Sequence, residues 1–150
     1  VAGKSITLVD GRTIHPDDVM GSPRAGTKFV FIGDASRTDD LVEPVRDADA
    51  LVIEATYTEL EADVAREFGH LTARQSADLA VAANVGHLLL NHVSRRYTEQ
   101  EILQEATPIF PNTVVVRDLD HYEIRRESGL VKLAPSRKKP ADGARPVPSE

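Results

Sequence analysis

The stretch that decides the fold is FGHLTARQSADLAVAANVGHLLLNHVSRRY, residues 68–97. Thr72 and Gln75 have the spacing of a capping box, which predicts a helix that begins at Ala73. Asn84-Val85-Gly86 ends that helix, because Asn and Gly tolerate the left-handed turn after a last helical turn. The helix would lie on a sheet through a smooth face of small side chains. These are Ala73, Ala77, Ala80 and Ala83.

The run His87-Leu88-Leu89-Leu90-Asn91 follows that helix and predicts a strand buried on both faces, as in a parallel sheet. His70 therefore stands just before a helix, and His92 stands just after the carboxyl end of a strand. In open α/β sheets, ligands bind at that edge. The stretch thus predicts an α/β fold with two histidines at its binding edge.

Similar patterns continue outward in both directions. The chain starts with a predicted hairpin around Asp10-Gly11, and a helical turn follows at Pro16–Val19. Further predicted strands cover Lys28–Ile32, Ala50–Ile53, Thr113–Val116 and, as a last edge strand, Tyr122–Arg125. Predicted helices run from the N-cap Thr38 to about Arg46, along an apolar face of Leu60, Val64 and Phe68, and from the Thr98/Glu101 capping box to about Ala106.

Composition narrows the class of protein. The chain has 150 residues and a net charge of −6, and it contains no cysteine, so any metal must be held by His, Asp or Glu. The acidic balance argues against broad, non-specific nucleic-acid binding. We expect one globular domain over residues 1–127 and a disordered basic, proline-rich tail over residues 128–150. No membrane-spanning run or signal peptide is visible, which predicts a cytoplasmic protein without membrane contact.

Four potentially reactive side chains fall at turns on one edge of the β/α pattern: Asp34, Glu54, His70 and His92. Singly, each has an ordinary structural explanation, such as a turn residue or a helix cap. Together they form a constellation that suits acid–base chemistry or metal binding. The remaining histidines are interpreted as structural or solvated. They are His15, His87 and His121.

Four segments then carry a resemblance to a known family. They are Gly33-Asp34, Ile53-Glu54-Ala55-Thr56-Tyr57, Gly69-His70-Leu71-Thr72-Ala73-Arg74-Gln75 and Asn91-His92-Val93-Ser94-Arg95-Arg96-Tyr97. In this order and spacing, between about Thr7 and Ile124, the chain resembles the C-terminal half of ribonuclease Z, the tRNA 3′-processing endoribonuclease of the metallo-β-lactamase superfamily. The resemblance implies half of a metallo-β-lactamase-type αββα sandwich.

The resemblance also implies roles for individual residues. Asp34 would bridge two zinc ions and His92 would be a terminal ligand on one of them. His70, working with Glu54, would protonate the leaving oxygen of an RNA phosphodiester. Ser94, Arg96 and Tyr97 match a Ser-x-Arg-Tyr segment that would hold RNA by charge-assisted bonds and stacking. The alternative for that segment is a lead into the next helix with a solvated arginine.

The chain departs from the family pattern at several places. Ala35, Ile53, Leu71 and Arg95 replace the usual residues of the four segments, which leaves substrate preference open. The family's His-x-His-x-Asp-His segment, which supplies most zinc ligands, has no counterpart in this sequence. Asp34 and His92 alone cannot close a dinuclear site. We therefore expect the activity to require an N-terminal half or a partner chain, with pre-tRNA or another phosphodiester as substrate.

Two other hypotheses remain open. One is a phosphodiesterase or sulfatase of the same superfamily that acts on small substrates. The other is a non-catalytic module that keeps the half-sandwich and serves in interaction or assembly. A half-sandwich exposes an apolar sheet face unless it pairs, so each hypothesis predicts a partner chain or a homo-oligomer.

Overall fold

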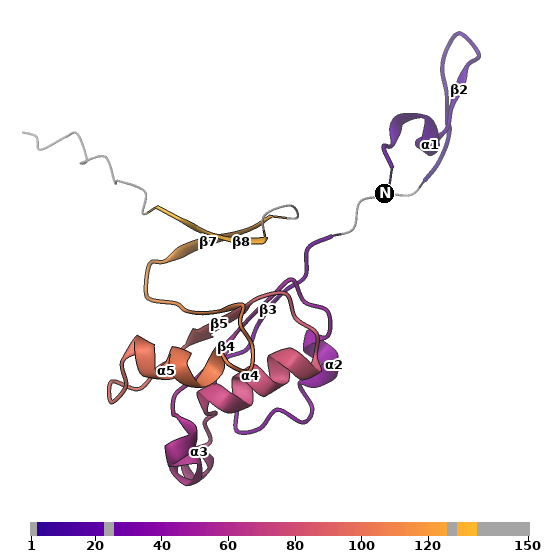
Figure 1. Cartoon of the computed structure of the whole chain (residues 1–150). Helices are drawn as coiled ribbons and strands as arrows, with labels where there is room; N and C mark the ends of the chain where they lie inside the picture. The colour runs from indigo at the N-terminus through magenta and orange to yellow at the C-terminus, as the bar shows by residue number, and fades with distance from the viewer. Residues whose placement is uncertain (1–2, 23–25, 126–128, 135–150) are drawn as a thin grey trace, which may run out of the picture.

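The computed structural model describes residues 3–22, 26–125 and 129–134. Its centre is a four-stranded parallel sheet in the order β3-β4-β5-β6 (Figure 1). All five residues of β4 are buried, as the predicted apolar run requires. The strands are β3 (Phe29–Phe31), β4 (Ala50–Glu54), β5 (Leu88–Asn91) and β6 (Thr113–Val115).

Helices connect consecutive strands, as parallel pairing demands. They are α2 (Val42–Val45), the 3₁₀ turn η1 (Glu59–Glu61), α3 (Ala62–Phe68), α4 (Ala73–Ala82) and α5 (Glu99–Ala106). Both predicted capping boxes are present, at Thr72/Gln75 and at Thr98/Glu101. The four alanines of the α4 face are fully buried, which confirms the close approach of this helix to the sheet.

The main core lies between the sheet and its helices. Leu51 and Ile53 of β4 and Leu88 and Leu90 of β5 are fully buried there, together with Ile102 of α5. Burial of each such side chain stabilises the fold by roughly 1.5–3 kcal/mol. Because side chains alternate along a strand, Val52 and Leu89 point to the opposite face.

That opposite face is only partly covered. Two antiparallel strands, β7 (His121–Arg125) and β8 (Gly129–Leu133), pack Tyr122, Ile124 and Leu130 against it. Phe29 and Phe31 of the edge strand β3 stay 54% and 62% exposed. Helices thus cover one face of the sheet, and a single hairpin covers part of the other (Figure 1).

The predicted N-terminal hairpin is present as β1 (Ile6–Thr7) paired with β2 (Thr13–Ile14), followed by the predicted turn α1 (Pro16–Val19). This unit stands apart from the central sheet (Figure 1). Across the described residues, none of the helices has the length and apolar character that crossing a membrane requires.

Three predictions about elements were wrong. Gly129–Leu133 were expected in the disordered tail, but they form strand β8, which pairs with β7. Residues 135–150 of that tail lie outside the described residues. Helix α2 begins at Val42, not after Thr38, and spans a single turn that contains Pro44. The expected apolar face of α3 fails because Leu60 lies in a 3₁₀ turn with a different period, so Leu60 and Phe68 are 96% and 65% exposed.

Candidate active site

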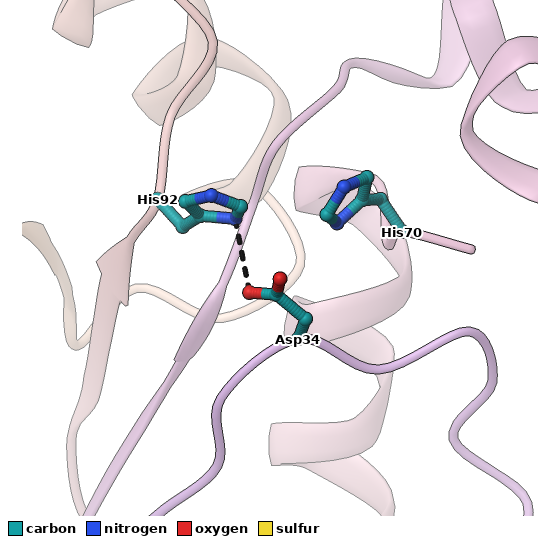
Figure 2. A group of neighbouring side chains, drawn as sticks. All are labelled: Asp34, His70 and His92. Carbon is teal, nitrogen blue, oxygen red and sulfur yellow. Dashed lines mark ion pairs between the residues drawn. The ribbon is translucent and has the colours of Figure 1, made fainter. Parts of the chain in front are cut away.

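The four side chains of the predicted constellation meet at the carboxyl edge of the sheet. Asp34 follows β3, Glu54 is the last residue of β4, and His92 follows β5. His70 comes from the loop between α3 and α4, where Gly69 ends α3 in the left-handed conformation with φ 75°. Figure 2 shows Asp34, His70 and His92 gathered around one point.

Glu54 is the buried centre of this edge, with an exposed fraction of 0%. Its Oε1 accepts the backbone N–H of Ala35 at 2.7 Å, and its Oε2 accepts the hydroxyl of Thr56 at 2.5 Å. His70 Nδ1 lies 3.0 Å from Oε2 and 3.2 Å from Oε1. Three donors therefore compensate a carboxylate that would be costly to bury alone.

This network sets the orientation of His70. A carboxylate can only accept, so the Nδ1 of His70 carries the proton that it shares with Glu54. The Nε2 of His70 is then the ring atom left to act on a ligand. The side chain of His70 is 20% exposed, so the ring is held from inside the protein and open on one side.

Thr56 is a site residue that the sequence argument did not single out. Its Oγ1 contacts Glu54 Oε2, the carbonyl oxygen of His92 at 3.0 Å and His92 Nδ1 at 3.0 Å. One hydroxyl proton cannot serve two acceptors fully, and the short contact assigns it to Glu54. Thr56 therefore links the Glu54–His70 pair to His92, and its position two residues after Glu54, just beyond the end of β4, was the available signal.

His92 occupies an unusual backbone conformation. Its φ is 52°, in the left-handed region that residues with a Cβ rarely adopt. Such strain costs about 1–3 kcal/mol and clusters at functional sites. The imidazole of His92 faces Asp34, with His92 Nδ1 at 3.2 Å from Asp34 Oδ1 (Figure 2).

Asp34, His70 and His92 together offer one carboxylate and two imidazoles. One ligand atom from each lies within 4.8 Å of the others, and the ring centroids of the two histidines are 5.2 Å apart. This donor set is the kind that zinc prefers in proteins without cysteine. Within the described part of the chain it is the single group of this kind.

The predicted RNA-binding residues follow His92 in the loop before α5. Ser94 Oγ accepts the backbone N–H of Arg96 at 3.4 Å. Arg96 Nη1 donates to Oε1 of Glu61 at 3.0 Å, and the hydroxyl of Tyr97 donates to Oε2 of the same residue. One carboxylate of η1 thus holds both side chains, a contact that sequence reasoning did not predict.

A hollow of about 400 Å³ adjoins His92. One wall is the loop that carries Ser94 and Tyr97, and the other is the chain that leaves β6. The hollow therefore shares His92 with the cluster of Asp34, His70 and His92. The residues that line it are His92, Val93, Ser94, Arg95, Tyr97, Glu99, Val115, Val116, Arg117 and Asp118.

Several ribonuclease Z proteins resemble this chain in sequence. Ribonuclease Z of Bradyrhizobium diazoefficiens is 50% identical over 119 residues, which are 79% of this chain and 40% of that protein. The resemblance to ribonuclease Z is confirmed. Ribonuclease Z of Archaeoglobus fulgidus is 42% identical over 124 residues, 81% of this chain and 40% of that protein. The chain spans about 40% of the length of the ribonuclease Z relatives that it matches.

A solved structure resembles the fold. The metallo-β-lactamase-fold protein YhfI of Bacillus subtilis matches with a TM-score of 0.54 and 24% identity, over 59% of this chain and 36% of that protein. The fold is therefore an α/β arrangement consistent with part of a metallo-β-lactamase-type αββα sandwich, as the likeness to ribonuclease Z implied. No protein-family model matches the chain.

Proposed function

We propose that this chain is the C-terminal part of a zinc-dependent phosphodiesterase that resembles ribonuclease Z and hydrolyses RNA phosphodiester bonds, with pre-tRNA as the substrate. The observation that carries the proposal is the joint cluster of Asp34, Glu54, His70 and His92 at the carboxyl edge of the sheet. The sequence likeness to ribonuclease Z supports it.

In this proposal His70 is the general acid. Glu54 fixes its ring through Nδ1, so that Nε2 faces the substrate and delivers a proton to the leaving oxygen. Thr56 fixes the side chains of Glu54 and His92 relative to each other by contacting both. Ser94, Arg96 and Tyr97 bind the RNA strand, and Glu61 positions the last two of them.

Asp34 and His92 are the proposed metal ligands. Because Nδ1 of His92 faces Asp34 and Thr56, Nε2 is the atom free for coordination. Two zinc ions in the complete site would supply Lewis-acid chemistry, which activates water and neutralises phosphate charge. The carboxylate and imidazole donors fit zinc, but they are too few to hold two ions.

This shortage is why we propose that activity requires the N-terminal half. The half-exposed Phe29 and Phe31 provide a second reason, since a sheet with a bare apolar region is suited to pack against another layer. A partner chain or self-association would satisfy the same face. We propose that the isolated chain is inactive.

One alternative function has an observation in its favour. The same bare sheet face and incomplete ligand set would suit a non-catalytic interaction module. That module would bind its partner without taking up zinc.

The test is to fuse the remaining N-terminal part of the Bradyrhizobium diazoefficiens ribonuclease Z to this chain and to measure zinc content and pre-tRNA cleavage. We expect close to two zinc ions per polypeptide and cleavage at the 3′ side of the tRNA body. Asp34→Ala and His92→Ala should lower the zinc content. His70→Ala should keep the zinc and slow cleavage by roughly 10²–10⁴-fold.

The matched control is His121→Ala, which removes an exposed histidine of β7. It should change neither zinc content nor cleavage. A folded fusion without zinc and without cleavage would refute the nuclease proposal and favour the interaction module.

A further inference from the structure

Arg95 differs from every other arginine that the structure describes. Its guanidinium makes no ion pair with a carboxylate of the described residues, in a chain whose net charge is −6. Each of the other described arginines has such a partner. The pairs are Arg12–Asp10, Arg37–Asp40, Arg46–Glu43, Arg66–Asp63, Arg74–Asp78, Arg96–Glu61, Arg117–Glu99 and Arg125–Glu123.

Arg95 lines the hollow beside His92, together with the hydroxyl group of Ser94 and the carboxylate of Asp118. Ser94 uses its oxygen to accept the N–H of Arg96, so its O–H remains free to donate. Across the hollow, the carboxylate of Glu99 accepts from Arg117 Nε at 3.1 Å and from Arg117 Nη2 at 2.5 Å. The charges of Glu99 and Arg117 therefore offset each other. An arginine without a carboxylate partner and a free hydroxyl therefore stand side by side in the chain.

The hollow is larger than a single phosphate needs. Its volume of about 400 Å³ lies within the range of small-ligand sites, which is roughly 300–1,000 Å³. Tyr97 also lines it, and the contact of its hydroxyl with Glu61 limits the positions that this side chain can take. Single-stranded RNA is bound by this combination of a cation for the backbone and an aromatic side chain for a base.

We propose that this hollow binds one nucleotide of an RNA strand, next to the phosphodiester at the Asp34–His70–His92 cluster, and that Arg95 binds the phosphate of that nucleotide. The inference rests on the proposed function, because it takes RNA as the substrate. It assigns a residue outside the expected Ser94, Arg96 and Tyr97 set.

The experiment is a two-dimensional NMR titration of the 150-residue chain with a 5′-phosphorylated ribodinucleotide in buffer with a chelator, so that nothing is hydrolysed. We expect shift changes at residues 94–97 and 116–118. Arg95→Ala should weaken binding roughly tenfold, as for loss of a charge-assisted hydrogen bond, and Arg95→Lys should restore part of it. Arg66→Ala, which removes an exposed arginine of α3, is the matched control and should bind as the wild type does.

Inorganic phosphate is titrated in parallel. Equal affinity for both probes, with the same dependence on Arg95, would show a plain anion site and overturn the nucleotide assignment. Binding that Arg95→Ala leaves unchanged, or no binding, would overturn the proposal entirely. Because this titration needs neither zinc nor cleavage, an Arg95-dependent result would stand even if the fusion protein proved inactive.

Discussion

Glu54 is the residue on which the geometry of the site depends. It is fully buried, and its two oxygens accept from Ala35, Thr56 and His70. Those three donors come from the chain after β3, the chain after β4 and the loop before α4. A single carboxylate therefore joins the end of its own strand to two other segments, 19 and 16 residues away in the sequence.

Replacing Glu54 with glutamine should show this dependence. The side chain keeps its size but loses one acceptor oxygen, so one buried donor faces an NH₂ group. We expect the free energy of unfolding to fall by roughly 1–3 kcal/mol, measured by urea denaturation. Glu67→Gln on the exposed side of α3 is the control and should stay within about 0.5 kcal/mol of the wild type. Equal stability of Glu54→Gln and the control would contradict the structural role.

The sequence predicted part of this residue-level picture. Asp34, Glu54 and His92 could be placed because they follow recognisable strands, and the ends of parallel strands share one edge. The bridging role of Thr56 and the left-handed φ of His92 could not be predicted, since both depend on how β4 and β5 lie relative to each other. The contacts of Glu61 with Arg96 and Tyr97 join residues that are at least 35 positions apart, so they could not be predicted from local sequence either.

At the scale of elements, local signals were the dependable ones. The capping boxes of α4 and α5 were predicted correctly because each is complete within four residues. Leu60 and Phe68 were misplaced because one 3₁₀ turn changes the period. Strand β8 was missed because its burial comes from β7 and from His87, whose Nε2 accepts the N–H of Leu130 at 3.2 Å.

The cap of α5 should respond to pH. The backbone N–H of Thr98, and then its hydroxyl, lower the pKa of Glu101 below its ordinary value of 4.5. A carboxyl group whose pKa is lower in the folded state stabilises the fold above its unfolded pKa, and that contribution is lost as the pH falls through the folded pKa. Glu101→Ala should therefore lower the melting temperature at pH 7, and this difference should vanish at a pH well below 4.5.

Gln104→Ala, on the exposed side of the same helix, serves as the comparison. Its effect on the melting temperature should be the same at both pH values. A Glu101→Ala effect that persists unchanged in acid would show that the cap does not depend on the charge of the carboxylate.

The whole molecule is dominated by the difference between the two faces of its sheet. The sequence predicted this half-covered architecture through its likeness to ribonuclease Z, but it did not identify which apolar side chains remain bare. Phe29 and Phe31 belong to the short edge strand β3, and their exposure depends on where the β7–β8 hairpin ends. How far the β7–β8 hairpin extends over the sheet depends on the complete fold and not on any local sequence pattern.

Phe31→Ser should therefore reduce self-association of the isolated chain. We expect the wild type to form larger species as its concentration rises, and the variant to stay closer to a monomer in sedimentation velocity experiments. Leu119→Ser removes an apolar side chain that is 88% exposed elsewhere, and it should leave association unchanged. If Phe31→Ser associates as strongly as Leu119→Ser, the bare face of β3 is not the contact surface.

The exposed phenylalanines of β3 also determine how any contact made through this face would respond to temperature. Covering apolar surface lowers the heat capacity, and the free energy gained from that burial shrinks on cooling. A layer that covered Phe29 and Phe31 would therefore be held less firmly near 0 °C than at warmer temperatures. In such a complex, cold storage would favour the separated chain, and warming would restore the contact.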